Sequence, residues 1–223
     1  MTIPPHSASY YVQVGSLLVL LLAAAVLGAG RYRQLPPNLR YLAWLAWFEL
    51  PLELVADLLG LLGHNNLFIM PIYTVGELAL LGLVYAQTLR SVAFSRIMPG
   101  LVGGFATYAL LDNLLAPDLS WFKPGQQVLQ SLLILGMVAL YFRQLLHELA
   151  VPRLEWEPMF WVSVGLALYF LGYLQIALFS NYMLRHYSMQ FNRTIWTIHY
   201  GLALLLHSCY CAALGLRPQP RRR

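Results

Sequence analysis

Residues 44–60 read Trp-Leu-Ala-Trp-Phe-Glu-Leu-Pro-Leu-Glu-Leu-Val-Ala-Asp-Leu-Leu-Gly, an apolar stretch that contains three acids. Glu49, Glu53 and Asp57 are four residues apart, so in an α-helix of 3.6 residues per turn each lies about 40° from the one before it. They therefore share one face of a predicted helix. An ionisable side chain inside a membrane is costly and usually functional, which makes this acidic stripe the first candidate for a functional site.

The composition of the whole chain is typical of a membrane protein. Of its 223 residues, 59% are hydrophobic and 10% are charged, and the mean hydropathy is +0.61. A soluble domain has about 25% charged residues. The sequence therefore predicts an all-α polytopic protein surrounded by membrane lipid, and we expect to find it in the cell (inner) membrane.

Apolar windows follow one another along the chain. Most are about 18 to 23 residues long, enough to cross about 30 Å of hydrocarbon as a helix. They predict one membrane domain, residues 1–216, built as a bundle of seven transmembrane helices and followed by a short basic tail at 217–223. The predicted helices cover residues 11–30, 41–63, 67–89, 97–116, 126–142, 159–180 and 195–216.

The basic residues predict the orientation, because Lys and Arg in short loops stay on the cytoplasmic side. Eleven of them follow the first, third, fifth and seventh predicted helices, whereas the other side holds only Lys123, Arg185 and Arg193. The N-terminus is therefore predicted outside and the C-terminus in the cytoplasm. The net charge of +5 fits a basic inner rim beside anionic lipid, so it indicates no nucleic-acid partner. A cytoplasmic protein partner would bind the connection from Arg143 to Pro158 or the basic tail.

Other polar residues fall at depths that match the acidic stripe. Along the second predicted helix, Glu49 lies about 12 Å and Asp57 about 24 Å from the inner surface. Polar side chains of the third, fourth and seventh helices reach the same outer half. We therefore predict an outward-facing pocket whose ligand-binding or proton-binding residues are Glu49, Glu53, Asp57, His64, Tyr73, Glu77, Asp112 and His199.

The acids also have a purely structural interpretation. Glu49 and Glu53 could belong to a buried network of protonated carboxyls that hydrogen-bond to Tyr, Asn and Gln of neighbouring helices. We expect no basic side chain at the same depth, so at least some of these acids should be protonated. His207, about midway along the seventh predicted helix, is expected to form a hydrogen bond that packs two helices together.

A metal site is a further interpretation of the same residues. Carboxylates and imidazoles bind divalent metals, although the spacing here matches no known zinc signature. Retinal bound as a Schiff base is excluded, because it needs a lysine in the last helix and the one lysine of the chain is Lys123, in a loop. The four residues that could hold a divalent metal are Asp57, His64, Glu77 and His199.

Three functions stay open on the sequence alone. The first hypothesis is a small-ligand receptor or sensor that signals to a separate cytoplasmic partner. The second is a proton- or cation-coupled transporter that uses the ladder Glu49, Glu53 and Asp57, although little in the inner half of the other helices continues the polar track beyond Glu49. The third is an intramembrane hydrolase, either metal-dependent or acid/base. A structural subunit of a larger complex is the remaining alternative.

Overall fold

The computed structural model describes residues 8–115, 123–148, 154–186 and 188–216, and within them the chain is helical with no strand. The predicted basic tail at 217–223 and part of the predicted docking connection, residues 149–153, lie outside the described residues. The long helices are α1 (Ala8–Arg31), α2 (Pro37–Leu61), α3 (Met70–Leu89), α4 (Val92–Leu114), α5 (Pro124–Glu148), α6 (Pro158–His186) and α7 (Met189–Gly215). Two short 3-10 helices, η1 (Leu67–Ile69) and η2 (Leu154–Trp156), precede α3 and α6.

Each long helix overlaps one of the seven apolar windows, so the all-α prediction is confirmed. Five of these helices are long and apolar enough to cross a membrane: α1, α3, α5, α6 and α7. The other two are of similar length but less apolar, because α2 carries the acidic stripe and α4 contains Pro99 and three glycines. The structure therefore supports a membrane-embedded helical protein.

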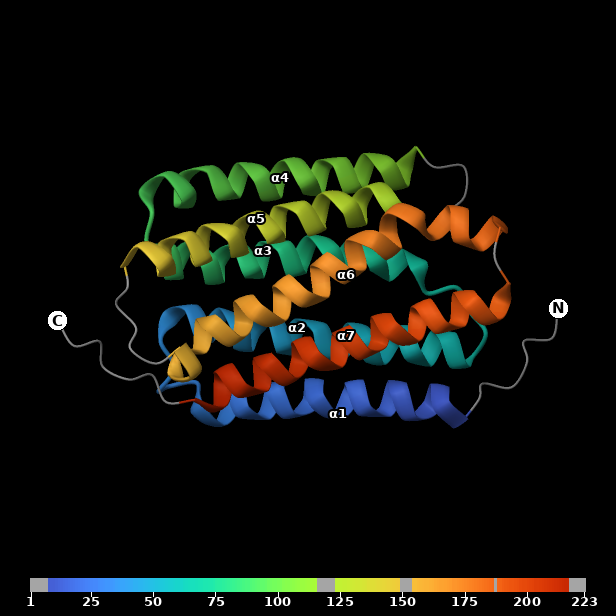
Figure 1. The fold of residues 1–223 in the computed structure, drawn as a ribbon, viewed down its shortest axis with the longest axis horizontal. Helices are drawn as coiled ribbons and strands as arrows, with labels where there is room; N and C mark the ends of the chain where they lie inside the picture. The colour runs from blue at the N-terminus through green and yellow to red at the C-terminus, as the bar shows by residue number, and fades with distance from the viewer. Residues whose placement is uncertain (1–7, 116–122, 149–153, 187, 217–223) are drawn as a thin grey trace.

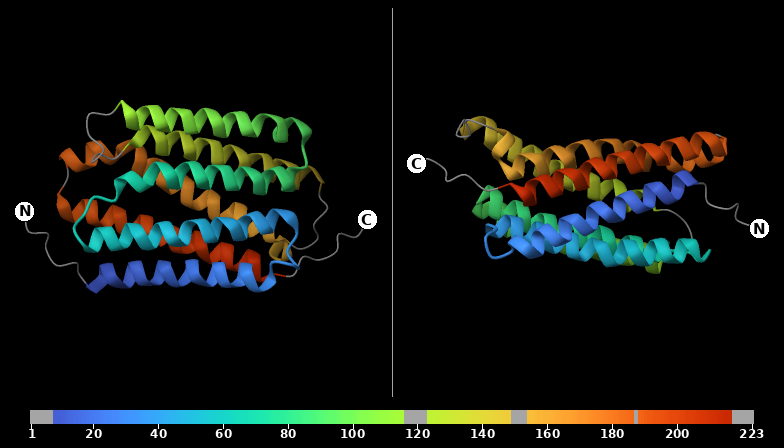
Figure 2. Two further views of the ribbon diagram at one scale, coloured as in Figure 1. Left: turned by 180° about the vertical axis from the view of Figure 1, so that it is seen from behind. Right: turned by 90° about the horizontal axis from the view of Figure 1, so that it is seen from below.

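Six of the helices form a closed ring (Figure 1). Around it, α1 packs on α2, α2 on α3, α3 on α5, α5 on α6, α6 on α7, and α7 returns to α1. The right-hand view of Figure 2 shows α6 and α7 on one side of the bundle and α2 on the other. The remaining helix, α4, lies outside the ring, mainly against α3. Side chains of α2 and α7 that point inward can therefore meet at the centre.

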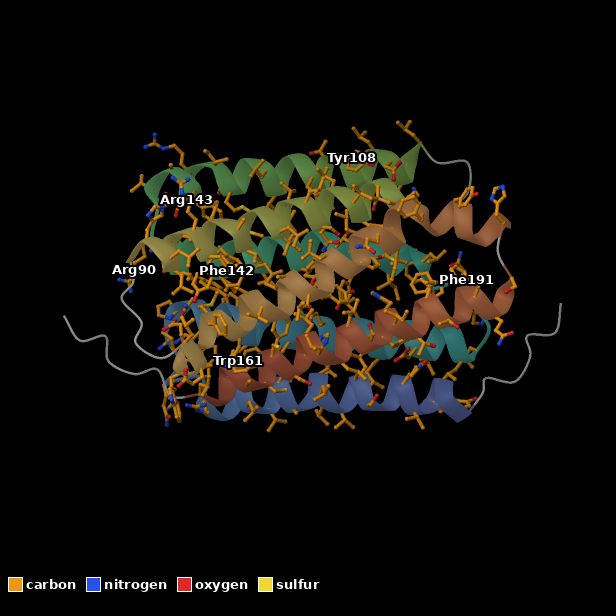
Figure 3. All side chains as sticks on the ribbon, viewed as in Figure 1. Arg90, Tyr108, Phe142, Arg143, Trp161 and Phe191 are labelled. Carbon is orange, nitrogen blue, oxygen red and sulfur yellow. The ribbon has the colours of Figure 1, made fainter. Side chains whose placement is uncertain are left out.

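The two ends of the bundle differ in charge. One end, called here the arginine end, holds Arg31, Arg90 and Arg143, and Figure 3 labels the last two there. The Arg31 guanidinium donates hydrogen bonds to the carbonyls of Leu214 and Leu216, so it joins the end of α1 to the end of α7. The opposite end, called the far end, contains the turn between α2 and η1 and the start of α5.

One glycine sets the distance between α2 and α3 at the centre of the bundle. A Cβ atom at Gly76 would collide with the ring of Phe48, so only glycine lets that ring lie against the α3 backbone. Each of these residues directly precedes an acid, Glu49 on α2 and Glu77 on α3. The close approach of the two helices therefore brings two buried carboxyl groups into the same region.

Candidate functional site

The centre of the ring holds a pair formed by an acid and a histidine. Glu49 is 1% exposed and His207 is 4% exposed, and His207 Nε2 lies 3.4 Å from Glu49 Oε2. The expectation that no basic side chain lies at the depth of the acids was therefore wrong. The cause is that α2 and α7 run in opposite directions across the ring, so position 49 of one helix meets position 207 of the other.

The second ring nitrogen of His207 defines what this pair can do. Nδ1 lies 2.7 Å from the carbonyl oxygen of Ala203, one turn earlier in α7. A carbonyl only accepts hydrogen bonds, so Nδ1 must carry a hydrogen. Nε2 then either accepts a proton from the Glu49 carboxyl or, as part of an imidazolium, donates to its carboxylate. In both states the pair shares one proton and has no net charge, which lowers its cost inside a membrane.

A second buried carboxyl lies beside the pair. Gln130 on α5 donates from Nε2 to Glu77 Oε2 at 2.7 Å and to the carbonyl of Thr74 at 3.3 Å. Glu77 is 4% exposed and Gln130 is 1% exposed, and Glu77 interacts electrostatically with Glu49. Three ring helices, α2, α3 and α5, thus place polar groups around one point.

Tyrosines complete this arrangement. Tyr73, Tyr169 and Tyr210 each lie within electrostatic range of both Glu49 and Glu77. The rings of Tyr169 and Tyr173 are stacked with their centroids 5.7 Å apart. We call the whole set the polar cluster, and α1 is the one ring helix that adds no residue to it. Its members are Glu49, Glu53, Tyr73, Glu77, Gln130, Tyr169, Tyr173, His207 and Tyr210.

Toward the far end the polar cluster continues through the acidic stripe. Glu53 is half-buried and interacts electrostatically with Glu49, Asp57 and His207. The Oδ2 atom of Asp57 and the Nδ1 atom of His199 are buried but have no hydrogen-bond partner in the described part of the chain. The His199 ring lies 4.8 Å from that of Tyr173, between centroids. This side of the polar cluster therefore presents two buried polar atoms that are available to bind something else.

Two of the predicted site residues lie neither in the polar cluster nor on its far side. His64 is exposed in the turn after α2. Asp112 lies on α4, outside the ring, where it accepts a hydrogen bond of 2.6 Å from Gln126 and lies 3.8 Å from Lys123 Nζ. Asp112 does lie near the end of its helix, as the sequence predicts. A position along a helix, however, does not show whether that helix belongs to the ring.

The four proposed metal ligands do not form a centre. Within the described ranges, no three His, Cys, Asp or Glu side chains come together as a metal ion would require. Of the predicted set, His64 is exposed, Glu77 is bonded to Gln130, and His199 packs among aromatic rings. Asp57 is therefore left without the neighbours that the metal interpretation needs.

Three residues that the structure makes central are not among the predicted site residues. The sequence predicts only a packing hydrogen bond for His207, and it does not single out Gln130 or Tyr210. The depth of His207, midway along its apolar window, was the available signal, because Glu49 lies at a similar depth. Comparison of the chain with protein-family models, with curated proteins and with solved structures finds no match.

Proposed function

We propose that the chain spans the membrane seven times, with its N-terminus outside and its C-terminus in the cytoplasm of the cell (inner) membrane. The position of α2 supports this topology, because α2 packs between α1 and α3, both apolar enough to span by themselves. A helix held between two spanning helices shares their depth. The arginine end then lies on the cytoplasmic side, where Lys and Arg accumulate.

Within this topology we propose that the protein is a proton-coupled transporter of a small polar solute. The observation that carries the proposal is the Glu49–His207 pair, because the fixed tautomer of His207 requires one proton between the two side chains. A coupled transporter needs such a proton site at the centre of the membrane. The ring of helices keeps this site away from lipid.

The solute would bind on the far side of the pair. Asp57 Oδ2 and His199 Nδ1 are buried there with no partner among the described residues, so a solute with hydrogen-bond donors, such as an amine, would satisfy the carboxyl oxygen. Glu53 lies between that position and the pair and interacts with both Asp57 and Glu49. A positive solute and a proton therefore compete for the same negative charges, which is a physical basis for coupling.

The proton site can be tested without knowing the solute. We expect pH-difference infrared spectra of the purified protein in lipid nanodiscs to contain a titrating carboxyl band. Glu49→Gln should remove the Glu49 component of that band, and His207→Asn should shift this component, because the carboxyl loses its proton partner. Asp112→Asn, which changes an acid outside the ring, is the matched control. A titrating band that persists unchanged in both pair variants would overturn the proposal.

A receptor for an apolar ligand is the second candidate function, and a different observation favours it. A cavity of about 480 Å³ lies between α6 and α7, where apolar residues such as Ile176, Phe179 and Ile195 line it. Its size is in the usual range for small-molecule sites. If an added apolar fluorophore binds there and Ile195→Trp displaces it, while the Glu49 carboxyl does not titrate, the receptor is the better assignment.

A further inference from the structure

The hydroxyl group of Tyr210 is a buried polar group that the proposed proton site does not use. Tyr210 follows His207 by three residues along α7, toward the arginine end, and the two rings meet edge to face with their centroids 5.6 Å apart. The residue is 1% exposed. Its hydroxyl has no hydrogen-bond partner within the described residues. A buried hydroxyl without a partner is unfavourable, so its surroundings need an explanation.

Polar groups from other ring helices surround this hydroxyl at longer range. Tyr210 interacts electrostatically with Glu49 of α2, with Glu77 and Tyr85 of α3, and with Tyr169 of α6. None of these groups donates a hydrogen bond to it or accepts one from it. A buried water needs two to four polar partners, and the unpartnered hydroxyl together with the polar groups within its electrostatic range could supply them.

Beyond Tyr210, further hydroxyl groups lie toward the arginine end. The hydroxyl oxygens of Tyr85 and Ser163 are 2.8 Å apart and join α3 to α6, and both residues are completely buried. Tyr85 lies eight residues after Glu77, which is about 12 Å farther along α3. Nearer the arginine end, Asn38 donates to the hydroxyl of Thr88 at 3.2 Å.

We propose that water bound at the Tyr210 hydroxyl connects the Glu49–His207 pair to the Tyr85–Ser163 hydroxyls. These groups then form the proton path through the arginine half, the part of the bundle between the pair and the arginine end. The proposal rests on the proton site described above and extends it. It also revises the expectation that the polar track ends near Glu49. The groups that continue the track are neutral hydroxyls, which a search for ionisable residues does not detect.

After the proton transfer, every group along the path has the same number of hydrogens as before. The shared proton leaves the contact between Nε2 and Oε2 for the water, and the water gives one of its own hydrogens to the Tyr210 or Tyr85 oxygen. Each hydroxyl that accepts a proton releases another to the next oxygen. Rotation of the hydroxyls then restores the starting orientation, so one proton has moved and no electrons have been exchanged.

The path is tested by the rate at which Glu49 re-equilibrates after a pH jump, read from its carboxyl infrared band in nanodiscs. In the intact protein the proton can use the far half or the arginine half. Asp57→Asn closes the first route. In that background we expect Tyr210→Phe, or Ser163→Ala, to slow the relaxation at least tenfold. Tyr108→Phe, on α4 outside the ring (Figure 3), should leave the rate unchanged.

The outcomes separate this inference from the proton site itself. If Glu49 titrates normally but Tyr210→Phe and Ser163→Ala relax as fast as the Asp57→Asn parent, the path is refuted and the proton site stands. If Glu49 does not titrate in the intact protein, both fail. A melting temperature supplies a second readout: Tyr210→Phe should lower it if the hydroxyl binds water, and should leave it unchanged or raise it if the hydroxyl is unpaired.

Discussion

The polar groups on the two sides of the Glu49–His207 pair differ in kind. Toward the far end they include acids, a histidine and tyrosines, and within the described residues Asp57 and His199 each have a buried atom without a partner. Toward the arginine end they are mainly hydroxyls, and those of Tyr85 and Ser163 are bonded and completely buried. Acids attract cations, whereas neutral hydroxyls can transfer protons without binding cations. Under the proposed function, the pair is the boundary at which a solute stops and a proton continues.

Removing the contact between Glu49 and His207 should have the largest effect on stability. His207→Phe keeps an aromatic ring but leaves the Glu49 carboxyl buried without its partner, and we expect a loss of about 3 kcal/mol in the free energy of unfolding. Chemical unfolding in detergent measures it. The double variant Glu49→Leu with His207→Phe should recover most of the stability, because no uncompensated group is left. A double variant as unstable as the single one would show that the two side chains are not coupled.

Separating the two acids at the centre should cost less. In Gly76→Val the new side chain collides with the ring of Phe48, so the ring must shift or α2 and α3 must move apart, and Glu49 and Glu77 with them. We expect a loss of about 2 kcal/mol, typical of overpacking, together with a changed carboxyl infrared band. Gly104→Ala on α4, where a Cβ meets open space, is the control. Equal melting temperatures for both variants would contradict the close approach of α2 and α3.

The hydrogen bond between Tyr85 and Ser163, in the arginine half, can be removed without changing the acids. Ser163→Ala leaves the Tyr85 hydroxyl buried without its partner, at a cost of about 1 kcal/mol. Adding Tyr85→Phe removes the orphaned group, so the double variant should be more stable than Ser163→Ala. Thermal unfolding monitored by circular dichroism compares the two. A further drop in the double variant would mean that the Tyr85 hydroxyl does not depend on Ser163 and is satisfied by another group, such as the water proposed above.

The smallest effect is expected outside the ring. Asp112→Asn disrupts an ion pair with Lys123 at the partly exposed end of α4, and such pairs contribute about 0 to 1 kcal/mol. Neither the melting temperature nor the Glu49 infrared band should change measurably. A shift of the Glu49 band in this variant would place α4 in contact with the polar cluster and would weaken the comparison between the two halves.

The sequence predicted the helices well and their arrangement poorly, for physical reasons. Apolar windows locate helices, because a segment that crosses or fills a hydrophobic layer must fold as a helix. The depth of each residue then follows from the rise per residue of that helix. Depth correctly grouped Glu49, Glu53 and Glu77. It could not reveal that α4 lies outside the ring, so Asp112 was grouped with them wrongly. It also could not identify His207 as the partner of Glu49, because that contact depends on which helices face one another.

The Glu49–His207 contact joins residues 158 positions apart in the chain, which has a consequence for synthesis. Translation proceeds at about 5 to 20 residues per second, so α2 is made about 8 to 30 s before the histidine that pairs with it. During that interval the nascent α2 has no imidazole to share a proton with. In the proposed topology α2 enters the membrane during that interval, and because a carboxylate in hydrocarbon is costly, a neutral carboxyl at Glu49 would be the form that enters. The first proton of the proposed site would then be acquired during insertion of the chain, before the ring has closed.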